Sequence, residues 1–230
     1  MLTSMKSIML LALALLVTPR GDVQGAETNH NFGVWEKEIS AYERVDATSP
    51  PPKDGIEFIG SSVIARWKTL TRDFPGQPVF DRGFGGSEIV DSTHFANRII
   101  FPYAPAKIFL RAGGNDLWAG KSPAQVFADF QEFAVLVHAK LPATEIYFIG
   151  WNPTPLRWRQ HEAEKALNTL VADFTRDKPW LKYIETYDLP LDAAGRPRPE
   201  LFVADRLHFN AAGYQLLAAR VGPFVNGASR

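Results

Sequence analysis

Two polar segments, far apart in this sequence, hold residue types that together could perform acyl transfer. In the first, Gly60-Ser61-Ser62 follows an apolar run, and in the second, Asp205 and His208 stand three residues apart. A serine hydroxyl at such a turn suits attack on a carbonyl carbon. A carboxylate beside an imidazole can hold its tautomer and stabilise its charged form. By itself, the first segment is also compatible with a capped turn, and the second with a solvated surface histidine.

Two glycine-rich segments offer donors for the negative charge that acyl transfer creates. They are the stretches 81–87 (Asp-Arg-Gly-Phe-Gly-Gly-Ser) and 110–116 (Leu-Arg-Ala-Gly-Gly-Asn-Asp). Glycines let backbone N–H groups approach a ligand closely, and the uncharged amide of Asn115 fits an oxyanion hole. The first stretch runs G-x-G-G and lacks the G-x-G-x-x-G spacing of dinucleotide-binding turns, so no nucleotide cofactor is indicated. A flexible turn and an Asx-turn are the alternatives.

The elements that must position these segments alternate along the chain. Apolar runs of strand length occur at 56–59, 79–80, 107–110, 145–149 and 181–184, and helical patterns at 35–44, 63–71, 87–99, 123–140, 157–177 and 210–221. Near-continuous apolar strands that alternate with helices predict a five-stranded parallel sheet with helices on both faces. Ligands of such sheets bind at the carboxyl ends of the strands. Three of the polar segments directly follow apolar runs, and the fourth precedes the last helix.

In their order and placement, the four segments resemble the sequence blocks of the SGNH (GDSL-type) hydrolase superfamily. The resemblance runs from residue 56 to about residue 219, and its most specific parts are Gly-Gly-Asn-Asp at 113–116 and Asp-x-x-His-x-Asn at 205–210. It implies a three-layer α/β/α sandwich with a five-stranded parallel sheet, a flavodoxin-like fold. It also implies a carboxylic ester hydrolase that works through an acyl-enzyme and needs no metal or other cofactor.

The resemblance assigns a role to each matching residue. Ser62 is the nucleophile, His208 the general base and Asp205 the residue that orients the imidazole. The oxyanion hole would consist of the backbone N–H groups of Ser62 and Gly86 and the side-chain amide of Asn115.

One block departs from the family pattern. The family has Gly-Asp-Ser where this chain has Gly60-Ser61-Ser62. Ser61 replaces a carboxylate that organises the local hydrogen bonding, and it adds a rival nucleophile. Ser62 is favoured because the motif places the nucleophile second after the glycine. The departure leaves open a catalytically weak, glycan-binding module on the same fold.

The N-terminus has the features of a secretory signal peptide. Lys6 precedes an apolar run over 8–17, and the small residues Gly25 and Ala26 follow. The run is too short to span a bilayer comfortably. We expect a signal peptide at 1–26, an N-terminal extension at 27–54 and a catalytic domain at 55–225. The protein would then be secreted or periplasmic, without stable membrane insertion after cleavage; a retained N-terminal anchor is the alternative.

Composition narrows the function classes further. The 25 basic and 25 acidic residues balance, so no charge excess points to nucleic acid as a partner. Cysteine is absent, which excludes disulfides, thiolate zinc sites, iron–sulfur clusters and a cysteine nucleophile. The sequence leaves the oligomeric state open.

Tryptophans near the strand ends bear on the substrate. Trp118 and Trp151 could stack on sugar rings or contact an acyl chain, although such residues more often pack in a core. Together with the predicted export, they favour a small-molecule or carbohydrate ester from which a small acyl group, such as acetyl, is removed. A lipid or lysophospholipid esterase is the alternative within the hydrolases, and the sequence has no long apolar lid that would favour it.

Overall fold

The computed structural model describes residues 30–227 of the 230-residue chain. The chain divides between Asn31 and Phe32 into two units, and every helix and strand named below belongs to the second. The predicted signal peptide at 1–26 lies outside the described residues.

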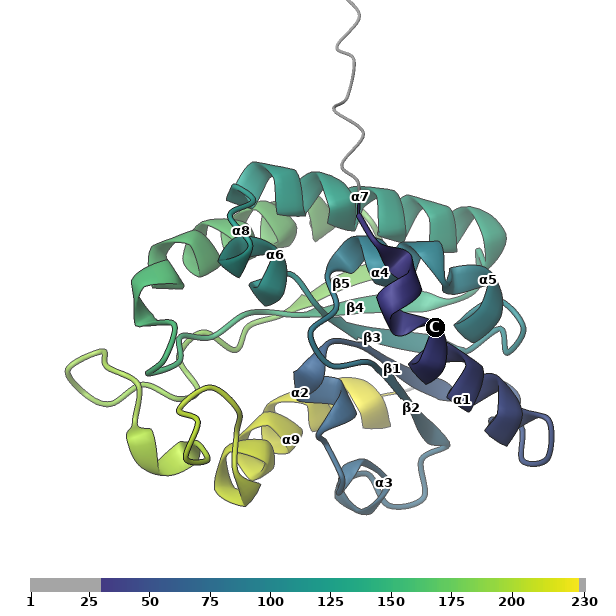
Figure 1. Ribbon diagram of the computed structural model, residues 1–230, viewed down its shortest axis with the longest axis horizontal. Helices are drawn as coiled ribbons and strands as arrows, with labels where there is room; N and C mark the ends of the chain where they lie inside the picture. The colour runs from purple at the N-terminus through teal and green to yellow at the C-terminus, as the bar shows by residue number, and fades with distance from the viewer. Residues whose placement is uncertain (1–29, 228–230) are drawn as a thin grey trace, which may run out of the picture. The chain divides into compact units, whose positions relative to one another are not determined.

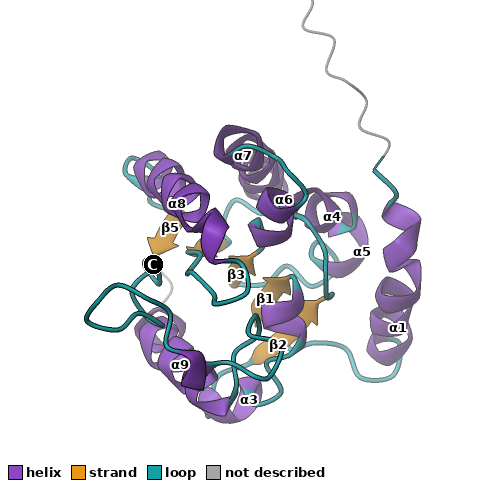
Figure 2. Ribbon diagram, turned by 60° about the vertical axis from the view of Figure 1, so that its left-hand side comes forward, coloured by secondary structure: helices purple, strands orange, loops and turns teal. Residues whose placement is uncertain are grey.

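Five parallel strands form the central sheet, in the order β2-β1-β3-β4-β5. They are β1 (Ile56–Gly60), β2 (Val79–Gly83), β3 (Lys107–Arg111), β4 (Glu145–Ile149) and β5 (Leu181–Ile184). Helices lie on both faces of the sheet (Figures 1 and 2), which confirms the predicted α/β/α sandwich with a flavodoxin-like strand order. The order reverses between β1 and β3, so a ligand crevice is expected at the carboxyl ends of these two strands.

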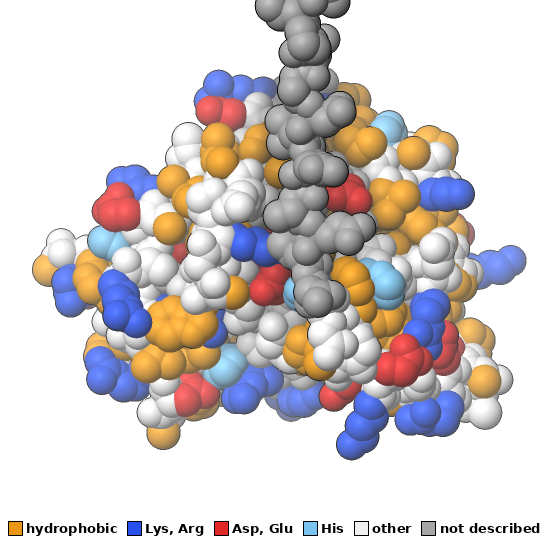
Figure 3. Space-filling model, turned by 45° about the horizontal axis from the view of Figure 1, so that its top comes forward, with side chains coloured by type: hydrophobic (Ala, Val, Ile, Leu, Met, Phe, Trp, Pro, Cys, Tyr) orange, Lys and Arg blue, Asp and Glu red, His pale blue; other side chains and the backbone are white. Residues whose placement is uncertain are grey.

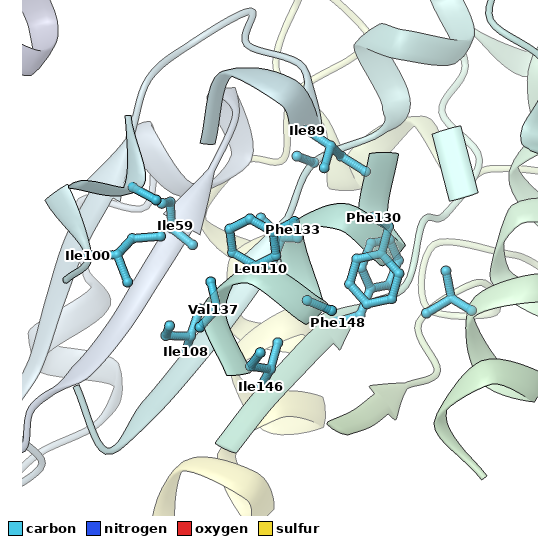
Figure 4. Close-up of a cluster of buried hydrophobic side chains, with 14 of the residues drawn as sticks. Ile59, Ile89, Ile100, Ile108, Leu110, Phe130, Phe133, Val137, Ile146 and Phe148 are labelled. Carbon is cyan, nitrogen blue, oxygen red and sulfur yellow. The ribbon is translucent and has the colours of Figure 1, made fainter. Parts of the chain in front are cut away.

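One face of the sheet is covered mainly by helices α4 (Ile89–His94), α5 (Ala96–Ile99), α7 (Pro123–Lys140) and α8 (His161–Thr175). Successive side chains of a strand point to opposite faces, so Ile108 and Leu110 of β3 both point to this side. They meet Phe133 and Val137 of α7 in a fully buried cluster (Figure 4). Burial of each such side chain contributes about 1.5–3 kcal/mol.

The opposite face is covered by α9 (Ala211–Asn226), α2 (Ser62–Ala65) and α3 (Leu70–Asp73). Phe58, Phe109 and Tyr147, from three adjacent strands, stack with ring centroids 4.7 and 4.6 Å apart. Leu217 and Val221 of α9 are buried against this stack. The residue after Phe109 on the same side of β3 is Arg111, which places a charged side chain below the crevice.

The helices differ from the sequence prediction at several points. The helix expected at 63–71 is interrupted, because α2 ends at Ala65 and α3 begins at Leu70. A short helix, α6 (Gly114–Trp118), occupies a segment that its two glycines marked as a turn. The last helix continues through Pro223 to Asn226, five residues beyond the predicted end.

Within the expected extension at 27–54, residues 32–46 pack against the fold. Its helix α1 (Glu36–Asp46) follows a short 3-10 helix (Phe32–Trp35). Ile39 of α1 is fully buried in the same cluster as α4, α5 and α7. The hydroxyl of Tyr42 donates to the carbonyl oxygen of Gly83, at the end of β2, over 2.6 Å. The segment thus supports one of the strand ends at the crevice.

Side chains of both charges are scattered over the face seen in Figure 3, with hydrophobic side chains in small groups between them. Trp118 is one of the large apolar side chains that remain exposed, at 46%. Between residues 30 and 227, no helix is long and apolar enough to cross a membrane.

Candidate active site

The end of β1 is shaped so that it presents Ser62 at the crevice. Gly60 has φ +135°, and a Cβ there would lie 2.2 Å from the carbonyl oxygen of Arg111. Only glycine fits so close to the neighbouring strand. The backbone N–H of Ser61 donates to the same carbonyl oxygen over 3.1 Å, and α2 then begins at Ser62.

Ser62, His208 and Asp205 form a continuous chain of hydrogen bonds. His208 Nε2 lies 2.9 Å from Ser62 Oγ, and His208 Nδ1 lies 2.7 Å from Asp205 Oδ2. Since a carboxylate only accepts, the imidazole proton resides on Nδ1 and Nε2 is left to accept the serine proton. The fold thus brings together a serine and an Asp-x-x-His segment that are 146 residues apart.

The loop itself holds Asp205 in place. Its Oδ1 accepts the backbone N–H groups of Leu207 and His208 over 2.9 and 3.0 Å. Burial raises the pKa of the Asp205 carboxyl, but the hydrogen bonds from His208 and Leu207 outweigh it and lower the pKa to about 2. Asp205 is therefore ionised over the whole ordinary pH range.

Gly86 and Asn115 lie at the same opening as Ser62 and His208. All four line a hollow of about 320 Å³, together with Arg66 and Arg157 among others. Gly86 has φ +91°, and the indole ring of Trp35 packs within 3.1 Å of where its Cβ would be. The glycine and the asparagine that were expected to supply oxyanion donors therefore line the same hollow as Ser62 and His208.

The orientation of the Asn115 amide is fixed by two contacts. Its Nδ2 donates to the carbonyl oxygen of Ser87 over 2.9 Å, and its Oδ1 accepts from Arg157 Nη1 over 3.0 Å. A primary amide has two N–H groups, so the contact with Ser87 leaves one for a ligand. Arg157 also donates to the carbonyl oxygen of Gly114 over 3.2 Å.

Arg157 was missed by the sequence reasoning. It lies in the loop that follows β4, and so it obeys the same strand-end rule that identified the other segments. In that loop, Trp151 was the residue predicted from the sequence to contact the substrate. The guanidinium of Arg157 also lies 4.9 Å from the ring centre of Trp118.

Asp116, next to Asn115, holds this segment in place through buried contacts. Its side chain is fully buried, and Oδ1 accepts the backbone N–H of Ile89 over 3.2 Å and lies 3.6 Å from Lys121 Nζ. Burial raises the pKa of Asp116 to about 7. Oδ2 is buried without a hydrogen-bond partner.

A second, much smaller cavity lies beside Ser62. Its volume is about 20 Å³, and the lining residues include Val63, Arg111, Trp151, Thr154 and Phe209. Arg111 is only 1% exposed and donates to the carbonyl oxygen of Gly150 and to Asn152 Oδ1. Burial lowers the pKa of Arg111 to about 10, so the guanidinium stays charged at neutral pH.

The two tryptophans expected at the mouth take different places. Trp151 is buried, at 7% exposed, and its indole N–H donates to the carbonyl oxygen of Ala112 over 2.7 Å. It is a wall of the small cavity and offers no open face for stacking. Trp118 is exposed, but the guanidiniums of Arg157 and Arg159 lie over its ring, at 4.9 and 5.4 Å from the ring centre.

Ser61, the rival nucleophile, is 1% exposed and lines the small cavity. The imidazole contact goes to Ser62. Among residues 30–227, no group of three or more His, Cys, Asp or Glu side chains could hold a metal ion.

With this geometry in place, sequence comparison decides the family. Residues 58–216 match the GDSL-like Lipase/Acylhydrolase family. The chain belongs to this family. Its membership makes the chain an ester hydrolase. No curated protein sequence matches the chain closely enough to count as a relative.

Solved structures of this GDSL-like fold are similar to the chain over most of their length. A Streptococcus pneumonia protein named after platelet activating factor superposes with TM-score 0.74 and 21% identity, covering 83% of this chain and 92% of the other. A GDSL-like lipase from Bacteroides thetaiotaomicron gives 0.65 and 18%, with coverage of 85% and 97%. A variant of the acetyl-xylooligosaccharide esterase Axe2 from Geobacillus gives 0.61 and 14%, with coverage of 77% and 98%. At these identities the likeness establishes the fold.

Proposed function

We propose that this GDSL-like hydrolase is a serine esterase whose nucleophile is Ser62. The observation that carries the proposal is the hydrogen-bond chain from Ser62 Oγ through His208 to Asp205, which opens into the hollow that Gly86 and Asn115 line. The catalytic mutants of Axe2 among the similar structures replace a serine and a histidine.

The proposed reaction has two halves. Ser62 Oγ attacks the ester carbonyl carbon while its proton passes to His208 Nε2. The tetrahedral intermediate then collapses, the bond to the leaving oxygen breaks, and His208 gives that oxygen the proton. A water molecule then attacks the acyl-enzyme and passes its proton to His208. The bond between the acyl carbon and Ser62 Oγ breaks, His208 returns the proton to Ser62, and the acid is released. Asp205, ionised at all ordinary pH values, stabilises the imidazolium in both halves.

The negative charge of the intermediate would be held by three donors. They are the backbone N–H groups of Ser62 and Gly86 and the free N–H of Asn115, whose amide Arg157 and Ser87 orient. Loss of one such donor typically raises the barrier by about 3–4 kcal/mol.

The small cavity supports an acetyl group as the acyl part of the substrate. A cavity needs about 10–15 Å³ to hold one water molecule. A volume of about 20 Å³ is therefore close to the size of a methyl group and smaller than a long acyl chain. This favours acetyl over the long acyl chains of the lipid esterase alternative. We propose a carbohydrate as the leaving group, consistent with the exposed Trp118, whose ring contacts Arg157 of the catalytic hollow, and with the substrate named for Axe2.

Active-site labelling tests the nucleophile directly. A fluorophosphonate probe should label the wild type and the variant Ser61→Ala, and it should fail on Ser62→Ala. The two serines are adjacent, so each variant is the matched control for the other. Labelling that disappears with Ser61→Ala instead would reassign the nucleophile, and an unlabelled wild type would favour the glycan-binding module.

A short ester panel tests the acyl group. p-Nitrophenyl acetate should be cleaved with a kcat/KM well above that of the butyrate, because the cavity beside Ser62 is close to the size of a methyl group. Equal rates for the two esters would refute the acetyl assignment while leaving the nucleophile in place.

The predicted export of the protein also stays a proposal. Cell fractionation should recover a chain that is shorter by about 26 residues outside the cytoplasm. A full-length cytoplasmic chain would refute it.

A further inference from the structure

We propose that the esterase acts on acetylated carbohydrates that carry carboxylates, and that a basic groove beside the catalytic opening binds those carboxylates. The basic groove is the hollow lined by Arg66, Lys68, Thr69 and Arg72 on one side and by Asn210 and Gln215 on the other. The proposal rests on the function proposed above, and it adds the chemical class of the leaving group.

The groove adjoins the catalytic opening at Arg66. Its volume is about 510 Å³, and Arg66 lines both this groove and the hollow that contains Ser62, Gly86 and Asn115. Volumes of about 300–1,000 Å³ are typical of sites for small ligands. The groove lies among α2, α3 and the start of α9, which are neighbours in Figure 1. A sugar chain that leaves the catalytic opening past Arg66 therefore enters it.

The charges that line the groove are unbalanced, although the whole chain is neutral. Arg66, Lys68 and Arg72 are exposed, and Asp73 is the one carboxylate among the lining residues. Asp73 Oδ2 accepts from Trp67 Nε1 over 2.7 Å and from Thr69 Oγ1 over 2.5 Å. Both donors are uncharged, so Asp73 still offsets one of the three positive charges, and the lining keeps an excess of two.

Of these cations, Arg66 lies near a carboxylate, with Nη1 3.7 Å from Asp205 Oδ2. In the described part of the chain, Lys68 and Arg72 form no ion pair, so they are the cations available to a ligand. Lys68 Nζ donates to the uncharged carbonyl oxygen of Ala65 over 2.6 Å. Arg157, which lines the catalytic opening, donates to the uncharged oxygens of Gly114 and Asn115. Arginine presents paired N–H groups that match a carboxylate, so the groove fits uronic acid units.

Matched substrates test the proposal. Acetate release is measured from partly acetylated oligogalacturonides and from the same oligosaccharides after methyl esterification of their carboxylates. The wild type should prefer the charged form by about fivefold or more in kcat/KM, and the preference should shrink as salt rises from 50 to 500 mM. Hydrolysis of p-nitrophenyl acetate, which carries no charge, reports whether the Ser62 chemistry operates.

The variant Lys68→Gln/Arg72→Gln should lose most of this preference, by about fivefold and chiefly through KM, as expected for two exposed ion pairs. Arg176→Gln is the matched control, because Arg176 is an exposed arginine near the end of α8 and lines neither hollow. It should keep the wild-type preference. A wild type that cleaves p-nitrophenyl acetate but treats the two oligosaccharides alike overturns the groove and leaves the proposed function intact.

A binding measurement tests the groove independently of ester hydrolysis. The variant Ser62→Ala is titrated calorimetrically with trigalacturonate and with its methyl ester. Tighter binding of the charged form, lost in Ser62→Ala/Lys68→Gln/Arg72→Gln, supports the groove even if no ester is ever cleaved. Equal binding of the two forms, or a preference that survives the loss of Lys68 and Arg72, overturns it.

Discussion

Arg157 is expected to contribute to catalysis by holding the Asn115 amide in place. Arg157 Nη1 donates to Asn115 Oδ1 over 3.0 Å and to the carbonyl oxygen of Gly114 over 3.2 Å. Arg157→Met keeps a side chain of similar length and removes both the charge and the donors. The Asn115 amide then loses one of the two contacts that fix its orientation.

The size of the effect follows from these contacts. A hydrogen bond to a charged group contributes about 1.5–3 kcal/mol, and an oxyanion donor contributes about 3–4 kcal/mol, which sets the upper limit. A loss of about 2 kcal/mol corresponds to a decrease of roughly 30-fold in kcat. KM should change little, because the interaction is made in the transition state.

The assay is steady-state hydrolysis of p-nitrophenyl acetate, an uncharged substrate that does not respond to lost surface charge. Arg159→Met is the matched control, since Arg159 lies over the same Trp118 ring at 5.4 Å and makes no contact with Asn115 in the described structure. It should keep a kcat close to that of the wild type. Thermal unfolding of both variants checks that neither has lost its fold.

A double-mutant cycle decides whether Arg157 works through Asn115. If it does, Arg157→Met should lower kcat only slightly once Asn115→Ala has removed the amide. The effects of the two substitutions on kcat should then be far from additive. Additive losses in kcat would refute the reasoning and would make Arg157 an independent contributor. An unchanged kcat in the single variant Asn115→Ala would remove Asn115 from the oxyanion hole altogether.

Four further predictions address the rest of the site and the fold. Asp205→Asn should lower kcat by up to about 10⁴-fold by favouring the wrong imidazole tautomer, with little change in KM; a loss under tenfold would exclude the proposed role. His208→Ala should abolish turnover yet keep the unfolding temperature near that of the wild type, and a large drop would make His208 a structural residue. Val63→Ala should enlarge the small cavity and raise the butyrate-to-acetate ratio of kcat/KM, at about 1–2 kcal/mol of stability; an unchanged ratio would mean that this cavity does not hold the acyl group. Because burial raises the pKa of Asp116 to about 7, its protonated form is favoured in the fold, so its contribution to stability is present at low pH and is lost as the pH rises toward 7. Asp116→Asn should therefore reduce the fall in unfolding free energy between pH 5 and pH 8 by about 2–3 kcal/mol, measured by urea denaturation, and equal slopes would contradict the shift.

Local patterns in the sequence were enough to predict the strands of the sheet and to choose the candidate residues of the site. Each apolar run became a strand, because a strand buried on both faces must be apolar throughout and is bounded by turn residues that act locally. The helices were harder to predict. The break between α2 and α3 and the short helix α6 depend on packing against neighbouring elements, which overrides local preference.

The sequence by itself determined the family and the fold class. It also determined which serine, aspartate, histidine, glycine and asparagine are candidates for the active site. Only the tertiary structure decided which of these touch, since Ser62 and His208 are 146 residues apart and Arg157 and Asn115 are 42 apart. It also decided that Trp151 is a buried wall and that the cavity beside Ser62 has a volume of only about 20 Å³. Hydrogen-bond geometry and cavity volume arise from side chains brought together by the folding of distant segments, and no local pattern encodes them.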